Sequence, residues 1–303
     1  MMKQPVVSVV LPVYNAELFL ADAIESILNQ TFSDFEFIIV NDGSLDSSLD
    51  IIKRYALIDT RIKLVDRENR GLIITLNEAL ELAQGDYIAR MDADDISLPT
   101  RFDKQVSYLS DNSNCVAVGV LANLIDSDDD LICSYNNLLS HEDIDGAHIK
   151  CQGGAIVHPS AMIRRRSMID VNGYSKLYPH AEDLDLWLRL AEVGYLTNIP
   201  EKLFLYRQHV NSIGYAHRIL QVESATRAVI DACQRRNINF ETINPATRKA
   251  EAVTINEVYV KWGWWALNDK NIDTARKYAI KALLSYPFNL AVWKLLVCSM
   301  RGY

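Results

Sequence analysis

The chain has 303 residues, of which 49% are hydrophobic and 23% are charged, and its formal net charge is -8. This composition is ordinary for a globular protein, so it excludes a disordered or fibrous chain, and the acidic balance argues against a nucleic-acid-binding surface. The length is sufficient for a full-sized main domain with a smaller appendage.

The cysteines show neither a disulfide framework nor the spacing of a structural zinc site. There are five, at positions 115, 133, 151, 233 and 298, and none forms a C-x-x-C pair. The N-terminal residues lack the apolar core of a signal peptide, and no apolar run approaches the roughly 18 residues of a membrane span. We therefore expect a cytoplasmic protein, whose contact with the inner face of the membrane, if any, is peripheral.

The first hundred residues alternate short apolar runs with amphipathic segments. This alternation predicts right-handed crossovers and a mostly parallel sheet with helices on both faces. Asn15 is expected to cap the first helix, and Gly85 to end the third. Strands are expected at residues 6–11, 35–40, 62–65 and 87–91, and helices near residues 20–28, 49–56, 71–83 and 102–109.

Polar clusters follow three of the predicted strands, at residues 12–15, 41–44 and 92–95. Ligands of parallel α/β sheets bind in the crevice beyond the carboxyl ends of the strands. Each cluster alone would be an ordinary loop or cap. Their shared position predicts that one crevice collects all three.

The acidic cluster at residues 92–95 carries the clearest chemical signal. Carboxylates crowded this closely repel one another, so a cation that neutralises them favours the arrangement. The i, i+2 spacing of Asp92 and Asp94 lets both reach one hard ion such as Mg²⁺ or Mn²⁺. An isolated cluster of this kind is more often a solvated turn, and that alternative remains open at this level.

The middle of the chain adds further strands and one helix. Two apolar runs between residues 115 and 136 are joined by the acidic residues 126–130, which we expect to form a solvated hairpin turn. A helix is expected to open at Glu182 and Asp183, whose charges would also be simple partners of the helix dipole. Further strands are expected at residues 160–163, 195–199 and 203–206.

Strand signals end near residue 214, so we expect a first domain over residues 1–214 and a helical region over residues 215–303. Small residues and a terminal proline in the helical region have the spacing of one tetratricopeptide-like hairpin. One such unit cannot bury its own apolar face, so it packs on the main domain, a partner copy or a membrane surface. The spacing is carried by Gly263, Ala275, Ala282 and Pro287, and three tryptophans, Trp262, Trp264 and Trp265, are expected in the core.

Six motifs, taken together and in this order, resemble the family 2 glycosyltransferases. The resemblance covers about residues 5–212, and the helical region lies outside it. The motifs are VVLPVYN at residues 9–15, VNDGS at 40–44, NRGL at 69–72, RMDADD at 90–95, HPS at 158–160 and EDLDLW at 182–187.

The resemblance implies a GT-A fold and an inverting transfer of a sugar from a nucleotide-diphosphate-sugar, expected to be a UDP-sugar. The acceptor would be the hydroxyl of a saccharide or lipid-linked acceptor in cell-surface polysaccharide or lipopolysaccharide assembly. A metal-dependent hexosyl- or N-acetylhexosaminyl-transferase is the expected enzyme, with Mn²⁺ or Mg²⁺ as the cofactor.

The resemblance also implies roles for individual residues. Asp183 matches the catalytic base, Asp94 the direct metal ligand, and Asp92 a position near both the ribose and the metal. Asp42 would accept a hydrogen bond from the nucleobase of the donor. Further nucleotide-binding positions are Pro12, Tyr14, Asn15, Arg70 and Arg90, and His209, with Arg207, belongs to a looser match near the diphosphate or metal.

Rival interpretations remain at this level. A catalytically silent sugar-nucleotide binder or scaffold would not need Asp183 and Asp94. A nucleotidyltransferase would show a glycine-rich, basic loop after the first strand, which residues 12–15 lack. A homodimer through the helical region and a peripheral membrane contact are both compatible with the sequence.

Overall fold

The computed structural model describes residues 4–209, 218–243 and 254–302. The chain divides into two compact units, which we describe separately. The first contains Met1–Leu121, Asn136–Phe204 and Leu220–Arg248, and the second contains Ala122–Tyr135, Leu205–Ile219 and Lys249–Tyr303. This division differs from a boundary at residue 214, because one helix groups with the first unit and one β-hairpin with the second.

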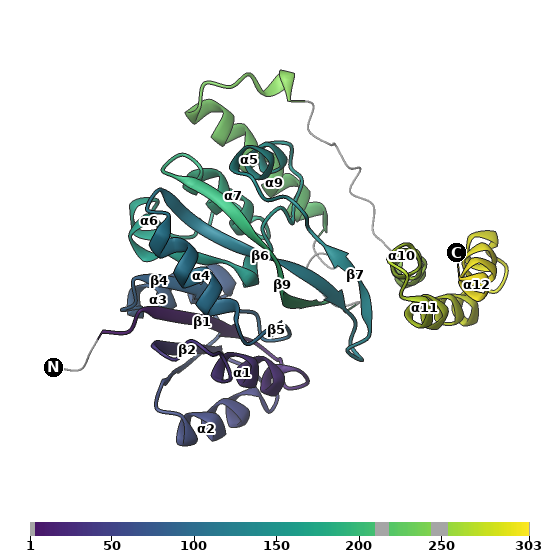
Figure 1. Ribbon diagram of the computed structural model, residues 1–303, viewed down its shortest axis with the longest axis horizontal. Coiled ribbons are helices and arrows are strands. Elements are labelled where there is room, and N and C mark those ends of the chain that lie inside the picture. Colours follow the sequence, from purple (N-terminus) through teal and green to yellow (C-terminus); the bar gives the residue numbers. More distant parts are fainter. Residues whose placement is uncertain (1–3, 210–217, 244–253, 303) are drawn as a thin grey trace. The chain divides into compact units, whose positions relative to one another are not determined.

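The strands form one mixed sheet in the order β3-β2-β1-β4-β8-β6-β9-β5, with β7 paired to β6 (Figure 1). β1 is parallel to β2 and β4, and β2 is parallel to β3, whereas β8 is antiparallel to β4 and β6. The parallel arrangement is thus confirmed for the first four strands only. The strands are β1 (Val7–Val13), β2 (Phe35–Asp42), β3 (Ile62–Arg67), β4 (Tyr87–Arg90), β5 (Ile96–Ser97), β6 (Cys115–Ile125), β7 (Leu131–Tyr135), β8 (Met162–Arg164) and β9 (Tyr195–Arg207).

The predicted helices between the first strands are present, and the C-terminal part of the described chain is helical. None of the helices within the described residues is both long and apolar enough to cross a membrane. The helices are α1 (Leu20–Leu28), α2 (Ser48–Ile58), α3 (Leu72–Leu82), α4 (Arg101–Asp111), α5 (His141–Ile149), α6 (Arg165–Asp170), α7 (Glu182–Leu190), α9 (Arg218–Arg235), α10 (Ile255–Asn268), α11 (Ile272–Ser285) and α12 (Leu290–Arg301).

The first unit is held together by a sheet that is buried on both faces. Val10 and Ile38 belong to one core cluster with Leu76 of α3 and Trp187 of α7. The residues that alternate with them, such as Phe37, are equally buried because successive side chains of a strand point to opposite faces. The helix α9 packs its buried Ala228, Val229, Ala232 and Cys233 against Leu184 and Leu188 of α7.

Three local predictions differ from the structure. Asn15 has a positive φ of 49° and lies before α1, whose N-cap is Phe19. Gly85 does not end α3, whose C-cap is Ala83; a Cβ on Gly85 would lie 2.6 Å from the backbone nitrogen of Ser8, so the glycine permits close approach to β1. The two strands expected at residues 195–199 and 203–206 are one strand, β9.

The second unit has its own apolar core, in which α10 and α11 pack on the β6–β7 hairpin. Trp262 and Tyr278 are buried and meet edge to face, with ring centroids 5.2 Å apart. Of the three tryptophans expected in the core, Trp262 is buried, whereas Trp264 and Trp265 are half-buried. Gly263 is where α12 approaches α10, since a Cβ there would lie 2.5 Å from a methyl group of Leu295.

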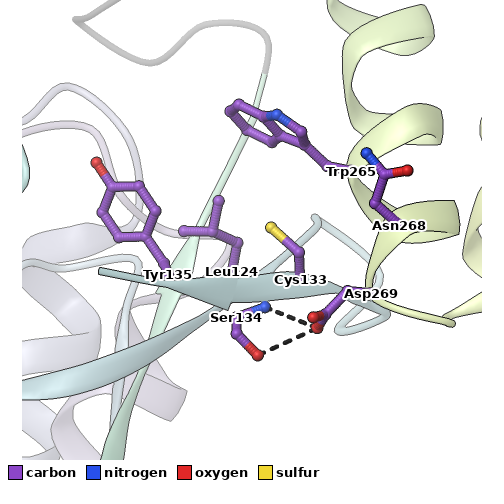
Figure 2. Close-up of a pocket in the computed structure, with 7 residues that line it drawn as sticks. All are labelled: Leu124, Cys133, Ser134, Tyr135, Trp265, Asn268 and Asp269. Carbon is purple, nitrogen blue, oxygen red and sulfur yellow. Dashed lines mark hydrogen bonds between the residues drawn. The ribbon is translucent and has the colours of Figure 1, made fainter. Parts of the chain in front are cut away.

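An open hollow of about 380 Å³ lies in the second unit, between β7 and α10 (Figure 2). Two of its lining residues are joined: Asp269 accepts hydrogen bonds from the backbone nitrogen and the hydroxyl group of Ser134, at 2.9 and 3.1 Å. In Figure 2 the ring of Tyr135 lies to the left of Leu124 and Cys133, and the ring of Trp265 lies above Cys133.

The acidic residues 126–130 form the expected hairpin turn between β6 and β7, and residues 127–130 are exposed, but Asp126 is not solvated. The side chain of Asp126 is fully buried and accepts hydrogen bonds from Lys277 at 2.6 Å and from the hydroxyl group of Tyr278 at 2.7 Å. Lys277 also pairs with Asp128 and Asp130, at 2.7 and 2.6 Å. The turn therefore binds α11, a contact that no local pattern reveals.

We expect Asp126→Asn to lower the free energy of unfolding by about 2 kcal/mol, because it leaves Lys277 without its buried partner charge. This is less than for a fully buried pair, since the Lys277 side chain is 21% exposed. Urea unfolding would measure the change. Asp128→Asn is the matched control, because Asp128 contacts the same lysine but is 61% exposed, and it should change stability by less than about 0.5 kcal/mol.

The effect of Asp126 should also depend on pH. Burial alone would raise the pKa of this carboxyl, but hydrogen bonds from Lys277 and Tyr278 bring it below its ordinary value. A lowered folded-state pKa stabilises the fold above the unfolded-state pKa of about 4, and this contribution is lost as the pH falls through the folded-state value. The difference between the parent and Asp126→Asn should therefore shrink below about pH 4. A difference in unfolding free energy that stayed constant well below pH 4 would contradict the ion pair between Asp126 and Lys277.

Candidate active site

The loops after β1 and β2 are joined to each other directly. The backbone nitrogen of Asn15 donates to the hydroxyl group of Ser44 at 3.0 Å, and the side-chain oxygen of Asn15 accepts from the backbone nitrogen of Leu45 at 2.8 Å. The positive φ of Asn15 suits this role, because asparagine tolerates the left-handed region better than most residues. The first two polar clusters thus lie together, as expected for the carboxyl ends of neighbouring parallel strands.

Asp42 organises the loop that follows β3. Its two carboxylate oxygens accept from the backbone nitrogens of Arg70 and Gly71, at 2.8 and 3.0 Å, and the guanidinium of Arg67 also donates to it. Arg67 in turn donates to Glu78 of α3 at 2.6 Å. Asp42 is buried and its carboxylate is already hydrogen-bonded, so it positions the loop at Arg70 and Gly71. Its expected hydrogen bond with the nucleobase of the donor stays a prediction.

The acidic cluster is assembled as its position after β4 predicts. Asp92, Asp94 and Asp95 each place a carboxylate oxygen within 4.8 Å of the others. Asp92 and Asp94 are half-buried, whereas Asp95 is fully buried. Burial raises the pKa of Asp92; Arg90 opposes this rise and the charge of Asp94 adds to it.

Two buried arginines support the cluster from below. Arg90 is 2% exposed and donates to Asp92 at 2.6 Å. Arg101, at the start of α4, is fully buried and donates to the carbonyl groups of Pro159 and Arg90, at 3.1 and 3.2 Å. Burial lowers the pKa of Arg101 to about 9, although the charge of Asp95 partly opposes the change. Both arginines hold the backbone that carries the carboxylates.

Asp183 lies in the first turn of α7 and shares an environment with this cluster. Its Oδ1 accepts from the backbone nitrogen of Leu184 at 2.8 Å, so the start of the helix orients the carboxylate. Burial raises the pKa of Asp183, and the charge of Asp92 adds to the rise whereas Arg90 opposes it. Burial and the neighbouring Asp183 also raise the pKa of Glu182 to about 7. The structure therefore brings Asp183 within electrostatic reach of Asp92 and Arg90.

Three aromatic side chains, His158, Tyr174 and Trp187, complete this region, and the sequence analysis gave none of them a role. The Nε2 of His158 lies 2.8 Å from the hydroxyl group of Tyr174, and the His158 ring meets that of Trp187 edge to face at 5.8 Å. Burial lowers the pKa of His158 well below its ordinary value, and burial raises that of Tyr174. His158 and Trp187 stood in the quoted motifs, but Tyr174 carried no signal in the sequence.

The donor set of the cluster fits a hard divalent cation. All the candidate ligands are carboxylate oxygens on one short loop, the type of ligand that Mg²⁺ and Mn²⁺ prefer. The raised pKa of Asp92 reflects a burial cost and a mutual repulsion that a cation would relieve. Asp92 and Asp94 would hold the ion from the more open side, and Asp95 from the buried side.

The remaining predicted residues are distributed more widely. Pro12 lies in β1, opposite Val40 of β2, and Tyr14 is 51% exposed beyond the end of β1. The side chain of Arg70 is exposed, and only its backbone nitrogen contacts Asp42.

The later arginine and histidine belong to the second unit. Arg207 donates to the Asp126 carbonyl at 3.0 Å and pairs with Asp129 at 2.6 Å, so its guanidinium stabilises the acidic turn. His209 follows β9 in the same unit. Its assignment as a metal ligand stays a prediction.

Comparison with known proteins agrees with this geometry. The family model described as glycosyl transferase family 2 matches residues 8–172, more than half of the chain. A glycosyltransferase of Haemophilus influenzae, described as uncharacterized, is 34% identical over 268 residues, which are 84% of this chain and 80% of the relative. The O-antigen biosynthesis glycosyltransferase WbnJ of Escherichia coli is 33% identical over 77% of this chain and 92% of its own length.

Solved structures share the fold. Residues 1–349 of TarS from S. aureus, in complex with UDP-GlcNAc, match 98% of this chain and 89% of their own, with a TM-score of 0.63 and 14% identity. The mannosyltransferase PcManGT of Pyrobaculum calidifontis, in complex with GDP-Man and Mn²⁺, matches 99% of this chain and 81% of its own, with a TM-score of 0.55 and 21% identity. The sequence motifs, the acidic cluster after β4, the GT-A-like fold and the family match lead to one conclusion: the chain belongs to glycosyl transferase family 2.

Proposed function

We propose that the protein transfers one sugar, with inversion at the anomeric carbon, from a nucleotide-diphosphate-sugar to a hydroxyl group of a saccharide or lipid-linked acceptor. One observation carries this proposal: the half-buried carboxylate of Asp183, at the start of α7, lies near enough to Asp92 of the acidic cluster for the charge of Asp92 to raise the pKa of Asp183. A base and a group that binds the diphosphate are the two elements that such a transfer requires.

In the proposed reaction, Asp183 takes the proton of the acceptor hydroxyl as its oxygen attacks the anomeric carbon. The bond between this carbon and the diphosphate breaks, and the electron pair leaves with the nucleoside diphosphate. Attack from the face opposite the leaving group inverts the configuration. A bound divalent cation would stabilise the negative charge that develops on the diphosphate.

The chain's own residues would prepare this step. Arg90 positions Asp92 through the hydrogen bond of 2.6 Å, and Asp42 holds the loop at Arg70 and Gly71. The exposed ring of Tyr14 and the linked loops after β1 and β2 would line the nucleotide side of the crevice. We assign Asp94 as the principal metal ligand and Asp92 as a group shared between ribose and metal.

The relatives support a role in polysaccharide assembly and leave two donor classes to compare. Their names include O-antigen biosynthesis and chondroitin synthase, and the solved neighbours hold UDP-GlcNAc and GDP-Man. We propose a UDP-sugar as the donor, and a hexosyl or N-acetylhexosaminyl residue as the group transferred.

A thermal-shift screen tests donor and cation together. A UDP-sugar present at about 100 times its Kd should stabilise the fold by about 2.7 kcal/mol, or roughly 5 °C in Tm. We expect this shift with Mn²⁺ or Mg²⁺ and its loss with a chelator. GDP-mannose is the comparison donor, and it should give a smaller shift than the UDP-sugar at the same concentration. Stabilisation by no sugar nucleotide, with or without a cation, would contradict the proposed function.

A donor hydrolysis or transfer assay separates an enzyme from a silent binder. The enzyme should release UDP when a saccharide acceptor is supplied, and the product should carry the inverted anomeric configuration, as read by NMR. Donor binding without any UDP release across an acceptor panel would favour the sugar-nucleotide-binding scaffold instead.

A further inference from the structure

The end of the second unit exposes an unusual number of large apolar side chains. Within α11, α12 and the loop between them, Phe288 is 97% exposed, Leu290 is 85% exposed and Leu284 is 81% exposed. Exposed large apolar side chains gathered on two helices that pack together mark an interaction site in a folded protein. We call this set the C-terminal apolar face; its members are Ile280, Leu284, Tyr286, Phe288, Leu290, Trp293, Val297 and Met300.

Helix α12 has two apolar faces rather than one. Val292 and Leu295 are buried against the rest of the second unit. Leu290, Trp293 and Val297 recur at i, i+3 and i+7, so they share the opposite face, and each is 45% exposed or more. An ordinary surface helix carries polar residues there. The second face is thus available to a partner outside this unit.

The loop between α11 and α12 holds its aromatic residues in a defined position. The indole nitrogen of Trp293 donates to the carbonyl oxygen of Pro287 at 2.6 Å. The side chain of Asn289 caps α12 by accepting from the backbone nitrogen of Ala291 at 2.9 Å. These hydrogen bonds hold the turn on either side of Phe288, whose side chain is exposed.

The charge of this region is opposite to that of the chain. Residues 274–303 contain five basic residues and neither aspartate nor glutamate, although the whole chain has a net charge of -8. Three of the five pair with carboxylates: Arg276 with Asp273 at 3.3 Å, Lys277 with the acidic turn, and Lys281 with Asp128 at 3.8 Å. Lys294 and Arg301 are exposed on α12, next in sequence to Trp293 and Met300 of the apolar face. Cations thus border the apolar surface.

We propose that the C-terminal apolar face binds the surface of an anionic lipid bilayer. Exposed aromatic and aliphatic side chains would enter the boundary between headgroups and acyl chains, and lysine and arginine would reach the lipid phosphates beside them. Trp, Tyr and Phe side chains favour this boundary, and the two exposed cations of α12, Lys294 and Arg301, provide the electrostatic attraction. This surface would keep the enzyme near lipid-borne acceptors.

The charge pattern favours a bilayer over a second copy of the chain. In a symmetric dimer through this face, the same patch of both subunits would form the interface, which would bring Lys294 and Arg301 of both subunits to one contact. Like charges across an interface disfavour association. An anionic surface instead complements them. The membrane is therefore the occupant that fits both the apolar and the basic side chains.

Sedimentation with lipid vesicles tests the proposal with the full chain and no nucleotide. We expect binding to vesicles of phosphatidylcholine and phosphatidylglycerol, weaker binding to phosphatidylcholine alone, and weakening by salt. Phe288→Ser with Leu290→Ser should reduce the partition coefficient at least tenfold, and Lys294→Gln with Arg301→Gln should remove the preference for phosphatidylglycerol. Both pairs are exposed, so the fold and the donor-induced thermal shift should be unchanged.

The control variant is Leu57→Ser with Ile58→Ser, since these apolar side chains are 86% and 76% exposed on the first unit. It should bind vesicles as the parent does. Binding that is absent, or equal in the Phe288 and control variants, would overturn the proposal. Sedimentation velocity without lipid tests whether a second copy of the chain occupies this face instead. If the parent is a dimer and Phe288→Ser with Leu290→Ser makes it a monomer, the face belongs to a second copy. Because no sugar nucleotide is used, failure here leaves the proposed transfer reaction untouched.

Discussion

Replacement of Asp183 by asparagine is expected to lower the turnover number by about 10² to 10⁴-fold while donor affinity changes less than about threefold. The amide keeps the shape of the side chain, and its oxygen can still accept from the Leu184 backbone nitrogen at the start of α7. Only the ability to take a proton is lost. Initial rates at saturating donor, together with titration calorimetry of the donor, measure the two quantities separately.

Asp50→Asn provides the matched control for this substitution. Asp50 also lies in the first turn of a helix, α2, but it is exposed and distant in sequence from the motifs after β4 and at α7. We expect its turnover number to stay within about twofold of the parent. Equal loss of donor affinity and turnover in Asp183→Asn would assign Asp183 to donor binding rather than to proton transfer.

The second large effect is expected from Asp94→Ala, which should weaken donor binding in the presence of Mn²⁺ by at least about tenfold. The substitution removes a half-buried carboxylate from a cluster whose oxygens lie within 4.8 Å of one another. The cation that links protein and diphosphate would then lose a ligand. Calorimetric titration of the donor with and without Mn²⁺ gives the metal-dependent part of the affinity directly.

Two comparisons make the Asp94 experiment specific. In a chelator, parent and Asp94→Ala should bind the donor equally weakly, since the cation no longer contributes in either protein. The exposed Asp50→Ala should bind as the parent does when Mn²⁺ is present. Metal-dependent affinity that survives in Asp94→Ala would remove this residue from the metal site and leave Asp92 and Asp95 as the ligands to examine.

Local sequence pattern predicted the first strands, the helices between them and the carboxylates that follow β4. Strand β4 and the residues 92–95 after it are adjacent in the chain, so their arrangement follows from the strand's position in the sheet. The association of Asp183 with Asp92 could be anticipated only through the family resemblance. No spacing rule connects residues that are 91 positions apart.

Errors arose where a residue's role depends on a distant segment. Gly85 was expected to end a helix, but it lets the chain pass close to Ser8. Asn15 was expected to cap α1, and instead it binds the loop after β2. Asp126 was expected in a solvated turn, but α11 buries it with Lys277. In each case, the local preference was weaker than the hydrogen bonds and packing available in the folded chain.

Apolar periodicity and the turn residues were enough to predict the α/β class and the position of the acidic cluster, because these depend on neighbours in the chain. The family was recognised through the resemblance of six motifs, and the family match confirms it. Only the tertiary structure decided that the sheet is mixed, and that Arg90 and Arg101 are buried beside the carboxylates. It also placed α9 with the first unit and left the second face of α12 exposed. These features arise from contacts between residues far apart in the sequence, whose energies no window of neighbouring residues contains.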